Sequence, residues 1–457
     1  MKIIILGAGQ VGSILAEHLS VEHEVTIIDE RSDVLENLQS AHDLQSLQGN
    51  GSSPKILREA GANDADLLIA VTANDDTNMI ACQIAYTLFH IPTRVARIRN
   101  RDYVREREAL FNNQVLPIDH IILPEILLTH QITQLIEYPG ALEMAHFGEN
   151  QLSIVSLNAY YGGLLVGFPI AKLQEFLPHT QTKILSIVRG ETVIIPQPST
   201  VIEAEDEVFF ISKTSDIKAV MSQLARLENL PKRIMIAGST DISYNLAKAL
   251  ENQMNVKLIV KNHECAINFE EQLKKTLVLE GNAADKKLLF EEQIDAVDYF
   301  LALSDDDEAN IMASLLAKKM GAKKTLAVVK RAVYLDLIQE STIDLIISPQ
   351  QSAISSILSW VRQGDISQVA SFNQGLLEAL EITAHGDFDS SQVVGRHINE
   401  LKLPQGVVIA GIIRNDNAII VEDDTVIEKK DKVIIFFNDV KKIGDVEKLF
   451  QVSGDFI

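Results

Sequence analysis

The sequence repeats itself once along its length, and this duplication constrains the fold more than any other feature. The opening segment KIIILGAGQVGSILAEHL returns as RIMIAGSTDISYNLAKAL from Arg233, and DADLLIAVTANDDTNMIAC returns as AVDYFLALSDDDEANIMAS. Further pairs, such as IDHIILPE and IDLIISPQ, follow in the same order and at nearly the same separation. The shared order and spacing indicate a tandem duplication, so the fold must be built from two copies of one unit.

The predicted secondary structure changes part-way along each copy. It begins with apolar runs of strand length, such as IIIL, that alternate with helical patterns, as in a parallel sheet covered on both faces. It continues with short, β-branched alternating strands and turn signals such as Arg189-Gly190. We therefore predict an α/β fold with two Rossmann-like parallel-sheet lobes, at residues 1–138 and 230–365, each followed by a small α+β lobe, at residues 139–229 and 366–457.

The composition excludes several kinds of partner and location. With 63 acidic and 41 basic residues the net charge is −22, so we expect no nucleic-acid partner, because phosphate backbones bind clustered Lys and Arg. Two cysteines, Cys82 and Cys265, lie far apart in no metal-binding spacing, which is typical of a reducing compartment. The start lacks a signal-peptide pattern and no run of about 20 apolar residues occurs, so we expect a cytoplasmic protein that does not insert into a membrane.

The opening segment carries a glycine pattern typical of dinucleotide binding. Gly7, Gly9 and Gly12 form G-x-G-x-x-G directly after an apolar strand and before a helix. The first glycine permits the turn, the second lets a pyrophosphate approach the backbone, and the third lets the helix pack on the strand. We expect the whole turn to bind the cofactor, that is Gly7, Ala8, Gly9, Gln10, Val11 and Gly12.

Asp29 and Asn50, at the ends of the second and third expected strands, extend this prediction. Asp29 ends the strand EVTIID, about 20 residues after the first glycine. A carboxylate there accepts hydrogen bonds from both ribose hydroxyls and repels a 2′-phosphate, which favours NAD over NADP. Asn50 follows the third strand, where we expect the adenine to lie.

Polar residues also follow the strands on the other side of the turn. Thr72, Ala73 and Asn74 come after DADLLIAV, at the carboxyl end of a buried strand, where ligands of open α/β sheets bind. Asn74 and the acids after it also fit a second interpretation, as helix caps. Arg97 and Arg99 end another strand, and two interpretations are open for them. One of the two side chains reaches a phosphate of the ligand, or both are ordinary surface charges.

The second copy is expected to be a degenerate site. Thr240 and Ser243 replace the second and third glycines, and a side chain at the first of these positions would obstruct the pyrophosphate. The sequence alignment places Lys261 opposite Asp29, which removes the ribose acceptor. This copy is then a purely structural duplicate, or else a mononucleotide or cation site.

The sequence offers no arranged catalytic groups. Histidines occur singly and the two copies share no catalytic signature, so we predict neither catalytic residues nor a metal site. Three functions are open: a nucleotide sensor, an NAD-dependent oxidoreductase, and a stand-alone nucleotide-binding assembly protein. Duplication without chemistry favours the sensor, because two lobes in one chain can tile a ring.

Several segments resemble the TrkA family: MKIIILGAGQVG, TIID, GNGSSPKIL, DADLLIAVTANDDTNMIAC, RVARIR, and LVGFPIAKL followed by TVIEAEDEVFFI. This family comprises peripheral regulatory subunits of bacterial Trk-type potassium uptake systems, with tandem RCK (regulator of potassium conductance) units. The resemblance implies a cytosolic homotetramer, built from dimers, at the cytoplasmic face of the inner membrane beneath a membrane-embedded potassium channel or transporter. It also implies binding of NAD(H), and of ATP or ADP, without turnover, through Gly7, Gly9, Gly12, Asp29, Asn50, Thr72, Asn74 and Arg97 or Arg99.

Overall fold

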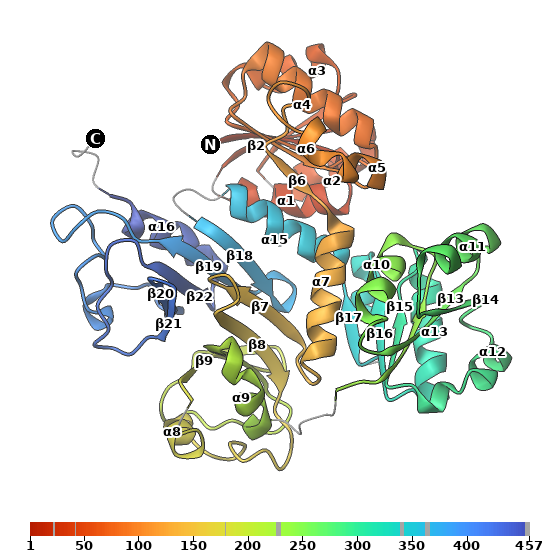
Figure 1. Ribbon diagram of the computed structural model, residues 1–457. Helices are drawn as coiled ribbons and strands as arrows, with labels where there is room; N and C mark the ends of the chain where they lie inside the picture. The colour runs from red at the N-terminus through yellow and green to blue at the C-terminus, as the bar shows by residue number, and fades with distance from the viewer. Residues whose placement is uncertain are drawn as a thin grey trace. The chain divides into compact units, whose positions relative to one another are not determined.

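The computed structural model describes residues 1–21, 23–41, 43–178, 180–224, 230–338, 342–361 and 366–452. In this part of the chain, two six-stranded parallel sheets alternate along the sequence with two five-stranded antiparallel sheets (Figure 1). The predicted fold class, a tandem duplication of a Rossmann-like lobe and a small α+β lobe, is confirmed. The boundaries that we placed after residues 138, 229 and 365 stay predictions, and residues 229 and 365 lie outside the described residues.

The first Rossmann-like lobe is a doubly wound sheet with the strand order β3-β2-β1-β4-β5-β6. Ile3 to Leu6 of β1 are each at most 2% exposed, because helices cover both faces of this central strand. The strands are β1 (Lys2–Leu6), β2 (Glu24–Asp29), β3 (Gln45–Gln48), β4 (Leu67–Ala70), β5 (Thr93–Arg97) and β6 (His120–Ile122). The helices are α1 (Gln10–Ser20), α2 (Ser32–Ala41), α3 (Pro54–Glu59), α4 (Asp75–Phe89), α5 (Arg101–Arg105), α6 (Arg107–Leu110) and α7 (Pro124–Glu137).

The second Rossmann-like lobe repeats this order as β14-β13-β12-β15-β16-β17. Its strands are β12 (Arg233–Ala237), β13 (Asn255–Val260), β14 (Leu277–Glu280), β15 (Tyr299–Ala302), β16 (Lys324–Val328) and β17 (Leu345–Ile347). Its helices are α10 (Asp241–Leu250), α11 (His263–Gln272), α12 (Lys286–Glu291), α13 (Asp307–Lys319), α14 (Ala332–Ile338) and α15 (Pro349–Val361). The duplication seen in the sequence is thus a duplication of topology.

The described residues divide into two compact units that do not follow the repeat. One unit holds the first Rossmann-like lobe up to residue 128 together with residues 329–338 and 348–361, which include α14 and α15 of the second copy. Within this unit α15 packs against α1 and β6 (Figure 1). The other unit holds the remaining described residues, including both small lobes.

The two small lobes, both in the second unit, share one hydrophobic core. Phe209 of β11 lies 5.9 Å from Phe372 of β18 and 6.1 Å from Phe436 of β22, measured between ring centroids. The first sheet comprises β7 (Glu143–Phe147), β8 (Leu152–Asn158), β9 (Thr182–Arg189), β10 (Thr192–Ile194) and β11 (Glu207–Lys213), with α8 (Leu173–Phe176) and α9 (Ile217–Leu224). The second comprises β18 (Ile366–Phe372), β19 (Leu377–Thr383), β20 (Val407–Arg414), β21 (Asn417–Ile420) and β22 (Lys432–Phe437), with α16 (Ile443–Phe450).

Among the described residues, no helix has the length and apolar character needed to span a bilayer.

Candidate nucleotide site

The three glycines of the opening turn have different surroundings. Gly7 has φ +101°, and a Cβ added there would lie 3.0 Å from the backbone of Thr72. A Cβ on Gly12 would lie 1.8 Å from the carbonyl oxygen of Gly7, so only glycine allows α1 to approach β1 this closely. A Cβ on Gly9 would meet nothing within 4 Å. The first and third glycines are therefore required by the fold, whereas the second leaves space into which a ligand can fit.

The N-terminus of α1 is suited to an anion. Gly9 is its N-cap residue and has no side chain to accept hydrogen bonds from the first-turn N–H groups. The first turn of α1 also contains no acidic residue. The positive end of the helix dipole and these N–H groups are the features that bind phosphate at helix N-termini.

Asp29 lies beside this turn, at the end of β2. Its Oδ2 atom accepts a hydrogen bond of 2.7 Å from the N–H of Ala8, and its Oδ1 atom accepts one of 3.0 Å from Nε of Arg31. Partial burial raises the pKa of Asp29, but the hydrogen bonds from Arg31 and Ala8 outweigh this effect and the pKa lies below its usual value. Asp29 is therefore an ionised acceptor attached to the turn.

Asn50 follows β3 and lies at the same edge of the sheet. Its Nδ2 atom donates to Oε1 of Glu30 at 3.1 Å, and its Oδ1 atom accepts from the N–H of Ser52 at 2.8 Å. These contacts fix the loop between β3 and α3 next to the end of β2. The structure thus brings Asn50 and Asp29 to the same side of the glycine turn.

The other predicted residues lie where β4 and β5 end. Asn74 is the N-cap of α4 and accepts from the N–H of Thr77 at 3.0 Å, so the helix-cap interpretation holds for this residue. Asp75 accepts from the N–H groups of Arg99 and Asn100, which ties the start of α4 to the loop after β5. A cavity of about 430 Å³ opens here, lined by Ala73, Asn74, Asp75, Asp76, Arg99, Asn100 and Tyr103.

Arg97 supplies a half-buried cation at the end of β5. Burial and the charge of Arg99 lower the pKa of Arg97 to about 10, partly offset by Glu125 and Asp75. Its Nε atom is buried and has no hydrogen-bond partner among the described residues. An orphaned guanidinium N–H at this edge of the sheet fits an anionic ligand.

Sequence reasoning missed two residues of this site, Arg31 and Asn78. Arg31 places a second cation beside Asp29, and its Nη2 atom lies 3.4 Å from the carbonyl oxygen of Ala8. Asn78 is fully buried; its side chain accepts from the N–H and hydroxyl of Thr72 and donates to the carbonyl of Arg97. It therefore holds the ends of β4 and β5 together. Its retention in both copies, as Asn78 and Asn310, is the sequence signal that could have revealed it.

The turn of the second Rossmann-like lobe is closed by its own side chains. The hydroxyl of Thr240 donates to the carbonyl of Leu303 at 2.7 Å and accepts from the N–H of Ser243 at 3.3 Å. The Ser243 hydroxyl lies 2.9 Å from that of Thr240. Hydroxyl side chains thus stand at the two positions that Gly9 and Gly12 hold in the first lobe, including the open position of Gly9.

One detail of the predicted alignment is wrong. The strand registers pair Lys2 with Glu24 in the first lobe and Arg233 with Asn255 in the second, so Val260, not Lys261, occupies the position of Asp29. The error arose because the second copy has no acid to mark the end of the strand. The conclusion that the ribose acceptor is lost still holds, since the side chain of valine cannot accept a hydrogen bond.

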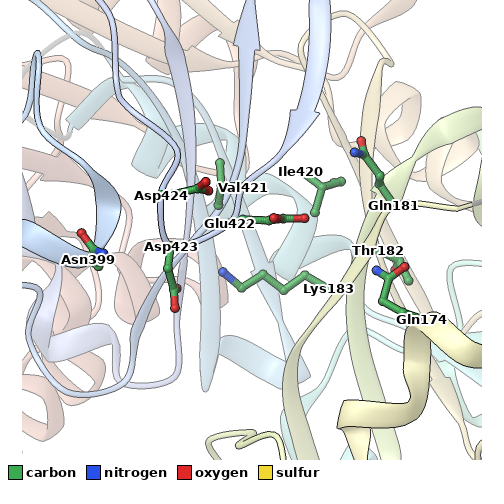
Figure 2. Close-up of a pocket in the computed structure, with 10 residues that line it drawn as sticks. All are labelled: Gln174, Gln181, Thr182, Lys183, Asn399, Ile420, Val421, Glu422, Asp423 and Asp424. Atoms are coloured by element: carbon green, nitrogen blue, oxygen red, sulfur yellow. The ribbon is translucent and has the colours of Figure 1, made fainter. Parts of the chain in front are cut away.

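A second cavity, of about 540 Å³, lies between the two small lobes (Figure 2). Lys183 extends into it, and its Nζ atom donates to the carbonyl of Ile409 at 3.2 Å. Glu422, Asp423 and Asp424 line the cavity and oppose a phosphate-bearing ligand. The nucleotide prediction therefore stays with the first Rossmann-like lobe. Among the described residues, no group of His, Cys, Asp and Glu side chains is arranged to hold a metal ion.

The model of the TrkA-N domain matches residues 3–124 and 234–349, and that of the TrkA-C domain matches residues 160–225 and 388–450. The chain belongs to the TrkA family. Its relatives from Haemophilus influenzae, Vibrio alginolyticus and Halomonas elongata, each named Trk system potassium uptake protein TrkA, are 52%, 50% and 48% identical to it. These matches cover 100% of this chain and 100% of each relative, so this TrkA-family chain has the length of its relatives.

Solved structures share the tandem architecture of this TrkA-family protein. The GsuK RCK domain has a TM-score of 0.59 at 16% identity, with 98% of this chain and 94% of that chain covered. The GsuK channel bound to NAD has the same TM-score and identity, with 98% and 78% covered. At this identity the likeness concerns the fold, which is that of two RCK units in tandem.

Proposed function

We propose that this chain is a cytoplasmic, nucleotide-sensing regulatory subunit of a Trk-type potassium uptake system. Identities of 48% to 52% over the full length of proteins that carry the Trk system name support this role. We infer that the chain is not an enzyme, and that it docks on a membrane-embedded potassium channel or transporter subunit at the cytoplasmic face of the membrane.

We propose that NAD(H) binds the first Rossmann-like lobe. The observation that carries this proposal is the bare turn at Gly9, where an added Cβ would meet nothing within 4 Å, in contrast to the hydroxyl-filled turn at Thr240. The NAD-bound GsuK channel, which shares the fold, is further support. ATP and ADP carry the same adenosine and diphosphate groups, so we extend the proposal to them.

The residues of the site have separate tasks in this proposal. The turn from Gly7 to Gly12 surrounds the pyrophosphate, which accepts from the N–H groups at the start of α1, because the N–H groups of Gly7 and Ala8 already donate to Ile28 and Asp29. Asp29 accepts from the adenosine ribose, and Asn50 lies near the adenine. Thr72, Ala73, Asn74 and Arg99 face the other half of the ligand, and Nε of Arg97 donates to one of its anionic oxygens. The bound cofactor supplies binding free energy, and no bond in it is broken.

Binding can set the state of an assembly only if the nucleotide prefers one conformation. A tenfold preference is worth about 1.4 kcal/mol per site, so four sites of a tetramer would bias a gate by about 5.5 kcal/mol. That bias moves a two-state equilibrium from roughly 1% to 99% open.

We propose that the chain assembles into a homotetramer through its Rossmann-like lobes. Ile80 and Leu88 of α4 are 50% and 52% exposed, and Ile84 lies between them on the same face at helical spacing. Met312 of α13, the counterpart of Ile80, is 60% exposed. An apolar stripe repeated in both copies supports contacts between copies of the chain. Ile80→Glu combined with Leu88→Glu should lower the mass measured by light scattering.

The decisive experiment combines binding with capture. Calorimetry on the full chain should detect NADH binding, and the chain should co-purify with a detergent-solubilised Trk-type membrane subunit in an amount that depends on NADH. Turnover of NADH by the pure protein with a panel of small carbonyl compounds would overturn the sensor proposal in favour of an oxidoreductase. If the chain does not co-purify with the membrane subunit, whichever nucleotide is added, the result would favour a stand-alone assembly protein.

A further inference from the structure

A helix from the second half of the chain packs against the helix that follows the glycine turn. Within one compact unit, α15 packs against α1, the helix that begins at the glycine turn (Figure 1). Ala353, Ile357 and Val361 of α15 follow one another at helical spacing and are each about 1% exposed or less. One face of α15 is therefore buried along the helix.

The first turn of α15 makes a polar contact with the first residue of α1. Nε2 of Gln350 donates to Oε1 of Gln10 at 2.6 Å. The hydroxyl of Ser348, just before the helix, donates to Oε1 of Gln350 at 2.8 Å. Gln10 directly follows Gly9, so this chain of hydrogen bonds runs from the residue after Gly9 to Ser348, which precedes α15.

The duplication gives this contact a natural comparison. In the other copy, Asp241 occupies the position of Gln10 and Glu125 occupies the position of Gln350. A carboxylate side chain has no amide N–H to donate, so the sequence of the other copy offers no equivalent of the hydrogen bond between the two amides. The amide pair is thus specific to the lobe whose glycine turn is bare.

We propose that Gln350 is a positioning residue of the first nucleotide site, through which occupancy of the glycine turn is communicated to the second half of the chain. This inference rests on the proposed binding of NAD(H) to that turn. By holding the Gln10 side chain, Gln350 fixes the start of α1, whose N–H groups face the pyrophosphate. A ligand that orders this turn then also orders the first turn of α15.

A double-mutant cycle on the full chain tests the inference. Gln10→Ala and Gln350→Ala should each lower NADH affinity roughly two- to tenfold, the range expected for one hydrogen bond. The double variant should lose no more than the larger single loss, because the two residues act as one unit. Gln350→Glu keeps the size and the acceptor but adds a charge beside the pyrophosphate, so its affinity should fall further and depend on salt.

Hydrogen exchange provides a readout that a merely structural role would not change. NADH should slow exchange in the first turn of α15 in the wild-type chain and should leave it unchanged in Gln350→Ala. Asp241→Ala is the matched control, and it should keep wild-type NADH affinity. An equal loss in this control would assign the effect to general helix stability and would overturn the inference.

The two proposals fail in different ways. If the wild-type chain binds no NADH, the proposed function fails and the inference fails with it. If the wild-type chain and Gln350→Ala bind NADH equally, and α15 responds equally in both, only the role of Gln350 is overturned.

Discussion

The carboxylate of Asp29 accepts a hydrogen bond of 2.7 Å from the N–H of Ala8, so the end of β2 is tied directly to the glycine turn after β1. The same carboxylate accepts from Arg31 at 3.0 Å. An acid that sequence analysis assigns to ligand recognition therefore also shapes the turn that receives the ligand. Loss of this side chain should affect both ligand affinity and the geometry of the turn.

Asp29→Ala should lower NADH affinity roughly tenfold or more, because hydrogen bonds to charged groups contribute about 1.5–3 kcal/mol. Asp29→Asn keeps an acceptor for the Ala8 N–H but loses the ion pair with Arg31, and it should bind with intermediate affinity. Calorimetry on the wild-type chain and the two variants measures their NADH affinities. Equal affinities in all three would show that Asp29 does not contact the cofactor.

Substitutions at two glycines should separate folding from binding. Gly12→Ala puts a Cβ 1.8 Å from the carbonyl oxygen of Gly7, so it should lower the thermal midpoint. A Cβ added to Gly9 meets nothing within 4 Å in the protein, so we expect Gly9→Val to keep the midpoint and to abolish NADH binding. Thermal unfolding measures the midpoint of each variant, and calorimetry measures its NADH affinity. Wild-type NADH affinity in Gly9→Val would mean that the turn is not the phosphate site.

Asn78 and Asn310 form a matched pair of buried amides. Each donates to the end of a neighbouring strand, Asn78 to the carbonyl of Arg97 at 2.9 Å and Asn310 to that of Val328 at 2.8 Å. Alanine at either position should lower the free energy of unfolding by about 1–3 kcal/mol, because buried partners are left unsatisfied. Only Asn78→Ala should weaken NADH binding, since Arg97 occurs in the first copy alone. A similar loss of affinity in Asn310→Ala would indicate that the second lobe also binds the nucleotide.

Much of the site could be predicted because the backbone geometry of the turn requires glycine at fixed positions. Gly7 and Gly12 occupy positions where a Cβ would collide with the chain, so their spacing carries the geometry of the turn. Arg31 was missed because an arginine two positions after an acid has no fixed role in a sequence. The contact between Gln10 and Gln350 could not be predicted from the sequence. It depends on α15 of the second copy packing against the first Rossmann-like lobe, which no sequence pattern indicates.

The last prediction concerns pH and the small lobes. Burial, with a smaller contribution from the nearby charge of Glu207, raises the pKa of Glu143 to about 8, although the N–H of Asn373 donates to it at 2.9 Å. The folded chain therefore keeps a proton on Glu143 that the unfolded chain has lost above a pKa of about 4.3. In this window Glu143 binds more protons in the folded state, so its own contribution to the stability falls as pH rises to about 8 and then levels off.

Glu143→Gln removes this titration and keeps the shape of the protonated acid. The difference in the free energy of unfolding between the variant and the wild-type chain should grow in favour of the variant between pH 5 and 8. Urea unfolding at several pH values measures this difference, and the subtraction cancels groups whose titration is the same in both proteins. A difference that does not change with pH would mean that Glu143 is ionised throughout, with its charge balanced inside the interface of the small lobes.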